Sequence, residues 1–456
     1  MARAKKEAAL TPEERLQAAL VPDWEWPYKL PENWCWTNWG ECGEFVAGSG
    51  FKNEYQGFTN YDIPFYKVSS LKTANETGYL CDNTNTVDET VRKKLKAALI
   101  PANSLLFAKI GEAIRLNRRA INTVPCCVDN NMMAFVPIIC QLKYAFYWSK
   151  GIDLYDFTNA TTVPAIRKTD LEKISFPLAP LAEQQRIVDR IESLFAKLDE
   201  AKEKAQDVVD SFEIRKAAIL HKAFTGELTA KWREEHGVGM ESWEKYKFNE
   251  LGTLERGRSK HRPRNDPKLF GGKYPFIQTG DVARSGMYIT EHTQTLSEVG
   301  AEQSKLFPKG TLCITIAANI GDVSILTYDC CFPDSVVGFT PNERTLSEYI
   351  YYLMSTLQRE IEANAPATAQ KNINLRILND LQLDIPSVAE QTQIVNQVEY
   401  LFFQEQHAKE AAEAVLEQID LMKKSILARA FRGELGTNDP SEESAAELLK
   451  RGLEKK

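Results

Sequence analysis

An internal repeat at a spacing of 207 residues limits what this 456-residue chain can fold into more than any other feature. Ala182-Glu-Gln-Gln-Arg-Ile-Val188 recurs as Ala389-Glu-Gln-Thr-Gln-Ile-Val395, and Ala223-Phe-Thr-Gly-Glu-Leu228 recurs as Ala430-Phe-Arg-Gly-Glu-Leu435. When the copies are laid over each other from Ala182 and Ala389, 21 of 47 positions agree without any gap. The absence of insertions indicates two copies of one structural unit whose length is constrained.

Both copies predict a long helix with one apolar seam. Their apolar residues recur in alternating steps of four and three, and this 3.5-residue period is the pattern of a coiled coil. From Glu183 to about Ala223, one uninterrupted helix would be on the order of 60 Å long at 1.5 Å per residue. Each helix alone has only a narrow stripe to bury, so we expect the two helices to pair. The predicted seam includes Ile187, Ile191, Leu194, Leu198, Ile394, Val398, Leu401 and Ile419.

The ends of both helices carry matching signals. Ser387 with Glu390 forms a capping-box pattern at the start of the second helix. Gly226 and Gly433 suit the two helix exits, where a left-handed backbone conformation is common.

A block of roughly 150 residues with short strands, turns and short helices precedes each helix. Trp34 and Gly43 in the first block correspond to Trp243 and Gly252 in the second. We therefore predict an α+β fold with two mixed α/β globular domains, two long paired coiled-coil helices and pseudo-two-fold internal symmetry. The predicted parts are an N-terminal extension (1–23), block 1 (24–180), a spacer helix (181–235), block 2 (240–386), a second spacer helix (387–435) and an acidic tail (436–456).

The distribution of charge leaves nucleic-acid binding open, although the net charge is −7. Block 1 carries 17 basic and 16 acidic residues, so the negative excess lies outside it. The two blocks share a framework while their polar residues diverge. One framework with two different surfaces is what a protein with two recognition tasks needs, and drift after duplication is the alternative explanation of the divergence.

Motifs for catalysis are missing from the sequence. It contains no G-x-x-x-x-G-K-[ST] phosphate loop, no Rossmann glycine fingerprint and no (Asn/Asp)-Pro-Pro-(Tyr/Phe) run for amino methylation. The five histidines lack metal-ligand spacing, and the adjacent pairs Cys126-Cys127 and Cys330-Cys331 suit small core residues. We expect no catalytic residue, no metal site and no cofactor in this chain. Without a membrane-length apolar run or a secretory signal, it is expected to be a soluble cytoplasmic protein.

A basic loop in block 2 is the strongest candidate for contact with DNA. Arg256-Gly-Arg-Ser-Lys-His-Arg-Pro-Arg-Asn265 brings forked guanidinium groups to a flexible segment, where they suit phosphates or guanine edges. A solvated basic loop without a ligand is the alternative. Arg258 is the predicted base reader, and Arg262 and Arg264 are the predicted phosphate contacts. The candidates in this loop are Arg256, Arg258, Ser259, Lys260, Arg262 and Arg264.

Further polar residues of both blocks are candidate DNA contacts by their chemistry. The equivalent loop of block 1 is rich in amide and aromatic groups, which suits adenine more than guanine. Its candidates are Lys52, Asn53, Tyr55 and Gln56, and block 1 adds Lys109, Arg115, Arg118, Arg119, Thr161 and Thr162. Block 2 adds Gln278, Thr279, Asp281 and Arg284, followed by Gln370, Lys371 and Asn372 at a predicted helix start.

The whole arrangement resembles the specificity subunit of type I restriction–modification systems. The resemblance rests on two variable blocks, each followed by Ala-Glu-Gln-x-x-Ile-Val and a long helix ending near Ala-Phe-x-Gly-Glu-Leu. Ser425-Ile-Leu-Ala-Arg-Ala-Phe-Arg-Gly-Glu-Leu435 and Ser444-Ala-Ala-Glu-Leu-Leu449 add to it. The two copies differ after the helix. The first copy continues as Leu228-Thr-Ala-Lys-Trp-Arg233, whereas the second continues as Gly436-Thr437 and then into the acidic tail.

The resemblance implies a non-catalytic subunit whose two domains read the halves of a bipartite DNA site. Antiparallel helices would set the gap between the halves and carry two modification subunits. Those partners would supply S-adenosylmethionine and adenine methylation, and restriction subunits would supply ATP- and Mg²⁺-dependent translocation and cleavage. Two alternatives remain at this point: a coiled-coil scaffold without DNA specificity, and a self-contained restriction or methylation enzyme, which would need the missing motifs.

Overall fold

The computed structural model describes residues 11–75, 77–80, 82–159, 163–260, 263–317, 320–363 and 375–455. The chain forms two compact units. The first unit combines the chain up to Lys204 with the segment from Val415 onward, and the second unit spans Ala205–Ala414. Within the described ranges, no helix is long and apolar enough to cross a membrane.

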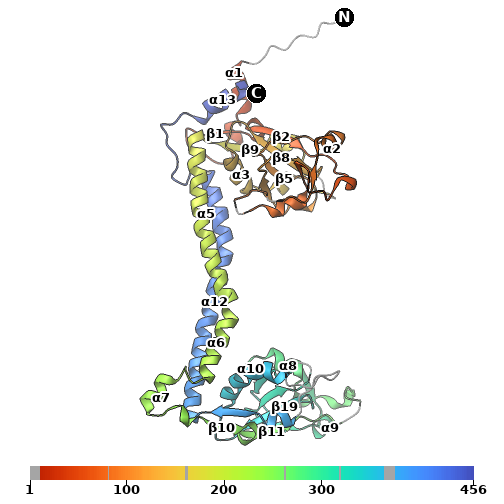
Figure 1. Ribbon diagram of the computed structural model, residues 1–456, viewed down its shortest axis with the longest axis vertical. Helices are drawn as coiled ribbons and strands as arrows, with labels where there is room; N and C mark the ends of the chain where they lie inside the picture. Colours follow the sequence, from red (N-terminus) through yellow and green to blue (C-terminus); the bar gives the residue numbers. More distant parts are fainter. Residues whose placement is uncertain are drawn as a thin grey trace. The chain divides into compact units, whose positions relative to one another are not determined.

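Block 1 is built on three small sheets in the first unit (Figure 1). Their strand orders are β1-β9, β2-β8-β5-β6 and β4-β3-β7. The strands are β1 (Cys35–Asn38), β2 (Gly43–Ala47), β3 (Ile63–Tyr66), β4 (Thr86–Val87), β5 (Leu105–Ala108), β6 (Arg119–Ile121), β7 (Cys127–Val128), β8 (Met132–Pro137) and β9 (Ser175–Leu178). The helices of the block are α2 (Glu89–Lys94), α3 (Leu142–Lys150) and α4 (Lys168–Glu172).

Aromatic side chains form the core of block 1. Trp39 is fully buried, and its ring lies 4.8 Å from Phe45, 5.1 Å from Phe135 and 4.9 Å from Trp148 on α3, measured between centroids. Burial of several large rings in one cluster is a main source of stability for a domain of this size. This core holds α3 against β5 and β6.

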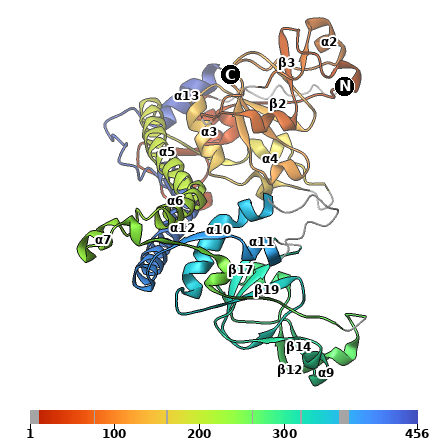
Figure 2. The same ribbon diagram turned by 60° about the horizontal axis from the view of Figure 1, so that its bottom comes forward.

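Block 2, in the second unit, has sheets with the orders β10-β20, β11-β19-β16-β17-β13 and β14-β12-β18-β15. Its strands are β10 (Glu244–Lys247), β11 (Gly252–Arg256), β12 (Phe270–Phe276), β13 (Tyr288–Ile289), β14 (Gln294–Leu296), β15 (Leu306–Phe307), β16 (Leu312–Thr315), β17 (Val323–Leu326), β18 (Cys330–Cys331), β19 (Val336–Pro341) and β20 (Gln382–Ile385). Its helices are α8 (Thr279–Arg284), α9 (Glu298–Glu302), α10 (Ser347–Ala363) and α11 (Leu375–Asn379). Figure 2 shows α9 beside β12 and β14.

The two blocks share one strand topology. The order β2-β8-β5-β6 in block 1 corresponds to β11-β19-β16-β17 in block 2. The registers also correspond, because Gly43 faces Pro137 and Gly252 faces Pro341 in antiparallel pairs. In both glycines a Cβ would lie 2.3 Å from a carbonyl oxygen of the partner strand, so a larger residue does not fit there. The cysteine pairs at 126–127 and 330–331 are buried, which confirms them as core residues.

The remaining helices are α1 (Pro12–Ala19), α5 (Leu181–Asp210), α6 (Phe212–Phe224), α7 (Ala230–His236), α12 (Val388–Ala430) and α13 (Ala445–Lys455). The first long helix is divided into α5 and α6 at a single residue, Ser211, whose backbone stays in the right-handed helical region (φ −83°, ψ −2°) and donates to the Asp207 carbonyl over 3.0 Å, as in a continuous helix. There the Ser211 hydroxyl donates to the Asp207 carbonyl, and the Arg215 guanidinium donates to the Val208 carbonyl over 3.0 Å. Side chains that take up helix carbonyls in this way disturb the helix.

In each unit, the two long helices contact each other with their chains running in opposite directions. In the first unit, Asp199 on α5 forms an ion pair with Lys423 on α12, and Ile187 and Ile191 share a core with Leu427. In the second unit, Arg215 Nε lies 2.5 Å from Glu405 Oε2, and the core includes Ile394, Val398 and Ala223. Of the predicted seam, Ile187, Ile191, Ile394, Val398 and Ile419 are buried, whereas Leu194, Leu198 and Leu401 are half-buried.

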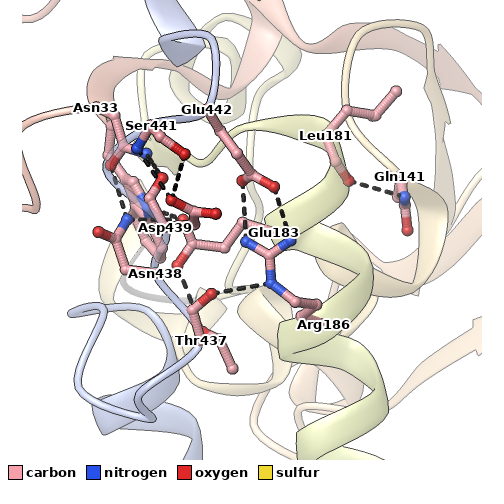
Figure 3. A network of polar contacts seen from close by, with 11 residues as sticks. Asn33, Gln141, Leu181, Glu183, Arg186, Thr437, Asn438, Asp439, Ser441 and Glu442 are labelled. Carbon is pink, nitrogen blue, oxygen red and sulfur yellow. Dashed lines mark hydrogen bonds and ion pairs between the residues drawn. The ribbon is translucent and has the colours of Figure 1, made fainter.

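The repeated glutamates at the helix starts are buried in polar networks. In the first unit, Glu183 accepts hydrogen bonds from Trp34 Nε1 (2.7 Å) and Asn438 Nδ2 (2.8 Å). Figure 3 shows how the segment Thr437–Glu442 reaches this site, where Arg186 forms two bonds of 2.7 and 2.9 Å with Glu442. The C-terminal segment is thereby attached to the start of α5.

The matching network in the second unit has a different composition. Glu390 accepts from Trp243 Nε1 (3.1 Å), Thr229 Oγ1 (2.7 Å) and Arg233 Nη1 (2.6 Å). Only one half of the predicted capping box forms. The Glu390 backbone amide donates to Ser387 Oγ over 3.3 Å, but the Glu390 carboxylate accepts from the three donors above instead of from the Ser387 amide. In each unit, therefore, a buried glutamate joins the start of one long helix to the segment that follows the end of the other long helix.

Candidate nucleic-acid interface

Five predicted residues of block 2 converge on one cavity of about 190 Å³. They are Arg258, Ser259, Lys260, Arg264 and Gln278. Residues of β12, β14 and α9 line the cavity, and Figure 2 shows these three elements next to one another. Its apolar lining comes from Leu269, Phe270, Phe276, Leu296 and Pro333.

The basic loop is anchored through backbone contacts at its start. The Gly257 amide donates to the Val336 carbonyl over 2.9 Å. A Cβ at Gly257 would lie 2.3 Å from the Pro333 oxygen, so only glycine allows this approach. The Ser304 hydroxyl also donates to the Arg258 carbonyl over 3.2 Å. These contacts hold the backbone while the side chains of Arg258 and Lys260 stay exposed.

The arginines of the loop differ in what neutralises them. Arg256 donates to the backbone carbonyl of Asp334, and Arg264 Nη2 lies 2.8 Å from Asp334 Oδ2. For Arg258 and Lys260, no carboxylate of the described residues lies within ion-pair distance. The cavity therefore offers two uncompensated cations beside an apolar floor. Cations of this kind attract phosphate or the acceptor groups of a guanine edge.

The predicted residues at the start of α8 are bound to one another. Asp281 is buried, and its carboxylate accepts from the Gln278 amide (2.8 Å), Arg284 Nη2 (2.9 Å) and Thr293 Oγ1 (3.3 Å). Gln278 Nε2 donates to Gln294 Oε1 over 2.7 Å at the edge of the cavity. Asp281 and Arg284 therefore stabilise the start of α8, and Gln278 is the member that faces the cavity. Thr279 is the first residue of α8.

The equivalent loop of block 1 is held by its own side chains. Gln56 accepts from Lys67 Nζ (2.8 Å) and donates to the Phe51 carbonyl (2.9 Å), so both ends of its amide are engaged. Lys94 Nζ lies 5.4 Å from the centre of the Tyr55 ring. Lys52 and Asn53 are exposed. Lys52 Nζ lies 4.0 Å from Glu54 Oε1, and Asn53 Oδ1 accepts from Gln56 Nε2 over 3.2 Å.

The other predicted residues of block 1 have different surroundings. Arg115 lies over the Tyr155 ring, with 3.6 Å between the guanidinium carbon and the ring centre. Lys109 is half-buried at the end of β5, Arg118 is exposed and Arg119 is buried. Arg118 and Arg119 line a second cavity. Thr161, Thr162, Arg262, Gln370, Lys371 and Asn372 lie outside the described residues.

Sequence patterns did not indicate several residues that complete these cavities. Gln303 and Ser304 join the block 2 cavity, and Lys72 and Lys150 join the block 1 cavity. Each comes from a segment remote from the predicted loops, so only the fold brings them together. Within the described part of the chain, no group of three or more histidine, cysteine, aspartate or glutamate residues is placed to hold a metal ion.

Comparison with known families gives a match to both halves of the chain. The family described as Type I restriction modification DNA specificity domain matches residues 31–209 and 240–415. Each match begins near the start of a globular block and ends within a long helix.

Comparison with individual proteins gives relatives of one kind. The chain is 24% identical over 332 residues to the type I restriction enzyme EcoBI specificity subunit of Escherichia coli, covering 64% of this chain and 67% of that protein. It is 27% identical over 311 residues to the EcoKI specificity subunit of Escherichia coli K12, covering 63% and 65%. These alignments span about two thirds of the relatives' length.

A solved structure has the same fold. The HsdS subunit from Thermoanaerobacter tengcongensis superposes with a TM-score of 0.65 at 18% identity, covering 90% of this chain and 100% of that chain. At this identity the similarity concerns the fold alone.

Proposed function

Since the chain belongs to the type I restriction–modification DNA specificity family, we propose that it reads the two halves of a bipartite DNA site, one with each block. In that family the specificity subunit is non-catalytic, and the enzymatic activity of the complex lies in partner subunits. The observation that carries the proposal is the shared strand order of the two blocks combined with different side chains on their equivalent loops. One loop presents Lys52 and Asn53, and the other presents Arg258 and Lys260.

We propose that some residues of the block 2 cavity read the bases of the DNA, whereas others contact the phosphates and position the protein. Arg258 is exposed and lacks a carboxylate partner among the described residues, which suits a bidentate contact with guanine. Arg264 is held by Asp334, so its remaining donors suit a phosphate, which positions the protein without reading sequence. Arg256, Lys260 and Arg262 complete the proposed basic set.

The two long helices are proposed to form an antiparallel coiled-coil spacer with pseudo-two-fold symmetry. The ion pairs Asp199–Lys423 and Arg215–Glu405 support this, because each joins an earlier residue of one helix to a later residue of the other. The two networks around Glu183 and Glu390 support the symmetry, since they repeat the same tryptophan-to-glutamate bond. In this proposal, helix length sets the gap between half-sites.

Partner subunits are proposed to dock on the helices. Several large apolar side chains of α12 are exposed: Tyr400 by 63%, Phe403 by 59% and Leu421 by 65%. Tyr400 and Phe403 are three residues apart and so lie on one face of the helix, and neighbouring exposed apolar groups of this kind indicate a protein interface. We propose two modification subunits, which use S-adenosylmethionine, together with restriction subunits that use ATP and Mg²⁺. We propose that the assembly works in the cytoplasm, where it meets its DNA substrate.

Single alanine variants of the block 2 loop test this function in the assembled complex. The chain would be produced with its modification subunits, and the methylated sequence would be mapped across a genome. Arg258→Ala should cost about 1–3 kcal/mol and relax one position of one half-site. Arg264→Ala should weaken all sites about equally and reduce the salt slope by roughly one unit.

Lys245→Ala is the matched control, because Lys245 belongs to the same block and pairs with Asp384 at the surface, outside the cavity lining. It should change neither specificity nor salt slope. The assignment of the loop fails if alanine at Arg256, Arg258, Lys260, Arg262 and Arg264 together leaves both unchanged. The chain purified without partners should not methylate DNA, and methyl transfer by it would overturn the division of labour.

A further inference from the structure

Four cations from separate segments of block 1 converge on the second cavity, whose volume is about 330 Å³. Lys72 follows β3, Arg118 and Arg119 lie at the start of β6, and Lys150 ends α3. The described residues that line this cavity include no aspartate or glutamate. A nearly neutral block thus concentrates positive charge at one concave site.

Arg119 is the buried member of this group, with 4% of its surface exposed. Its guanidinium donates to the Arg118 carbonyl (3.1 Å), Asn117 Oδ1 (2.8 Å) and the Ser149 carbonyl (3.1 Å). All three acceptors are neutral, and Nε has no hydrogen-bond partner in the described structure. A buried cation without an ion-pair partner costs stability, and an anion bound in the cavity would offset that cost.

Carboxylates outside the cavity lining compensate its positive charge only in part, because Asp82 interacts with Lys72, Asp153 with Arg119 and Asp199 with Lys150. Burial lowers the pKa of Arg119 to about 9, and the more distant Asp153 opposes this only partly. Burial also lowers the pKa of Lys150, and repulsion from Lys423, Arg119 and Lys143 adds to the effect while Asp199 opposes it. An anion held in the cavity would remove this repulsion.

We propose that the cavity lined by Lys72, Arg118, Arg119 and Lys150 binds a phosphate group. Two sources of the same chemistry fit: a backbone phosphate of the DNA, in which case the inference rests on the proposed function, or a free phosphate-bearing molecule. Several cations around one site favour a doubly charged or multiply accepting oxyanion over a single carboxylate. The volume lies at the lower end of ordinary ligand pockets, which span roughly 300–1,000 Å³.

Exposed members of the site allow a test that spares the buried arginine. Lys72→Ala/Lys150→Ala removes two of the four cations. Both residues are accessible at the surface, and the partly enclosed ammonium group of Lys150 is destabilised by the cations around it, so folding should be preserved. Lys168→Ala is the control, because Lys168 is exposed in the same block and pairs with Glu172 at 3.6 Å, outside the cavity lining. A circular dichroism spectrum and the melting temperature in chloride establish that all three proteins are folded.

The first arm measures melting of the full chain in inorganic phosphate and in chloride at equal ionic strength. Phosphate stabilises proteins in general, and this general part is common to all three proteins. If the site accepts a free phosphate, the excess stabilisation by phosphate should be smaller in Lys72→Ala/Lys150→Ala than in the wild type and Lys168→Ala.

The second arm measures binding of the assembled complex to a DNA duplex as a function of salt. If the site accepts a backbone phosphate, the double variant should reduce the salt slope by roughly one to two units and leave the methylated sequence unchanged. A change in either arm supports the site and identifies the source of the phosphate. If both arms match Lys168→Ala, the inference is overturned. Failure of the wild-type complex to methylate any specific sequence would instead overturn the proposed function.

Discussion

At the scale of single residues, Glu183 and Glu390 occupy equivalent positions of the repeat but have different hydrogen-bond partners. Glu390 pairs with Arg233 at 2.6 Å, and the two side chains are exposed by only 1% and 8%. Glu183 occupies the matching position but receives its hydrogen bonds from neutral donors, Trp34 and Asn438. The same substitution should therefore have different consequences at the two sites.

Glu390→Gln should destabilise the second unit by about 3–5 kcal/mol, because removal of the carboxylate leaves Arg233 buried without its counter-ion. Glu183→Gln should cost about 1 kcal/mol or less, since Trp34 and Asn438 both donate to Oε2 and an amide oxygen in its place can still accept both hydrogen bonds. Urea unfolding of each variant measures both effects. Equal losses at the two positions would contradict the assigned role of Arg233.

The pH dependence of stability should distinguish the wild type from Glu183→Gln. Burial raises the pKa of Glu183, so the folded chain binds this proton more tightly than the unfolded chain. The stability from this group is complete below the unfolded pKa of about 4.3 and is lost as pH rises through the raised folded pKa. The unfolding free energy of the wild type should therefore fall relative to the variant across that window. A constant difference between the two proteins from pH 4 to 7 would exclude the effect.

Residue-level prediction from sequence succeeded where one local rule decides the conformation. Gly226 and Gly433 have φ of +79° and +73°, as expected at helix exits. It did not extend to groups that distant segments bring together. The amide of Gln56 predicts a contact with adenine, but Lys67 from another segment engages that amide. Nor does the local pattern around Arg119 indicate burial, since two other cations, Arg115 and Arg118, lie among the five residues that follow Ile114.

At the scale of elements, the tail is more ordered than its acidic composition suggests. The segment from Ala445 to Lys455 forms α13, which packs against α1 (Figure 1) and contributes Ala445 and Leu449 to the core of block 1. Its apolar residues follow a helical period, so the sequence contained the signal. The interruption at Ser211 had no comparable signal, because it depends on how Arg215 folds back onto the Val208 carbonyl.

Leu449→Ala should destabilise the first unit by about 2–5 kcal/mol, because the side chain is fully buried and its removal leaves a cavity. Leu453→Ala is the comparison, since Leu453 is only partly buried at the edge of the same core and should lose less. Denaturant unfolding gives both values. If Leu449→Ala lost no more than Leu453→Ala, α13 would not be a structural part of the unit.

At the scale of the whole molecule, the gapless repeat leads to a prediction about spacing. One heptad would be inserted into each long helix, between the ion pairs Asp199–Lys423 and Arg215–Glu405. Seven residues preserve the seam and add about 10 Å at 1.5 Å per residue. That equals roughly three base pairs at 3.4 Å each. The mapped gap between half-sites should lengthen by this amount while the half-site sequences stay the same.

A control for this insertion replaces one native heptad in each helix by another coiled-coil heptad without changing the length. It should leave the gap as in the wild type. If the inserted chain kept the original gap, the helices would not determine the spacing.

The discontinuous first unit has a consequence for the order in which the protein forms on the ribosome. The second unit is one continuous segment, Ala205–Ala414, so it can fold as soon as that segment has emerged. The first unit needs the residues from Val415 onward, which are synthesised more than 200 residues after Lys204. Until then Ile187 and Ile191 lack Leu427 and Phe431, their partners in the core. Contacts of such long sequence separation form slowly, so the first domain to be translated is the last to be completed, and the apolar start of its long helix stays exposed on the nascent chain until then.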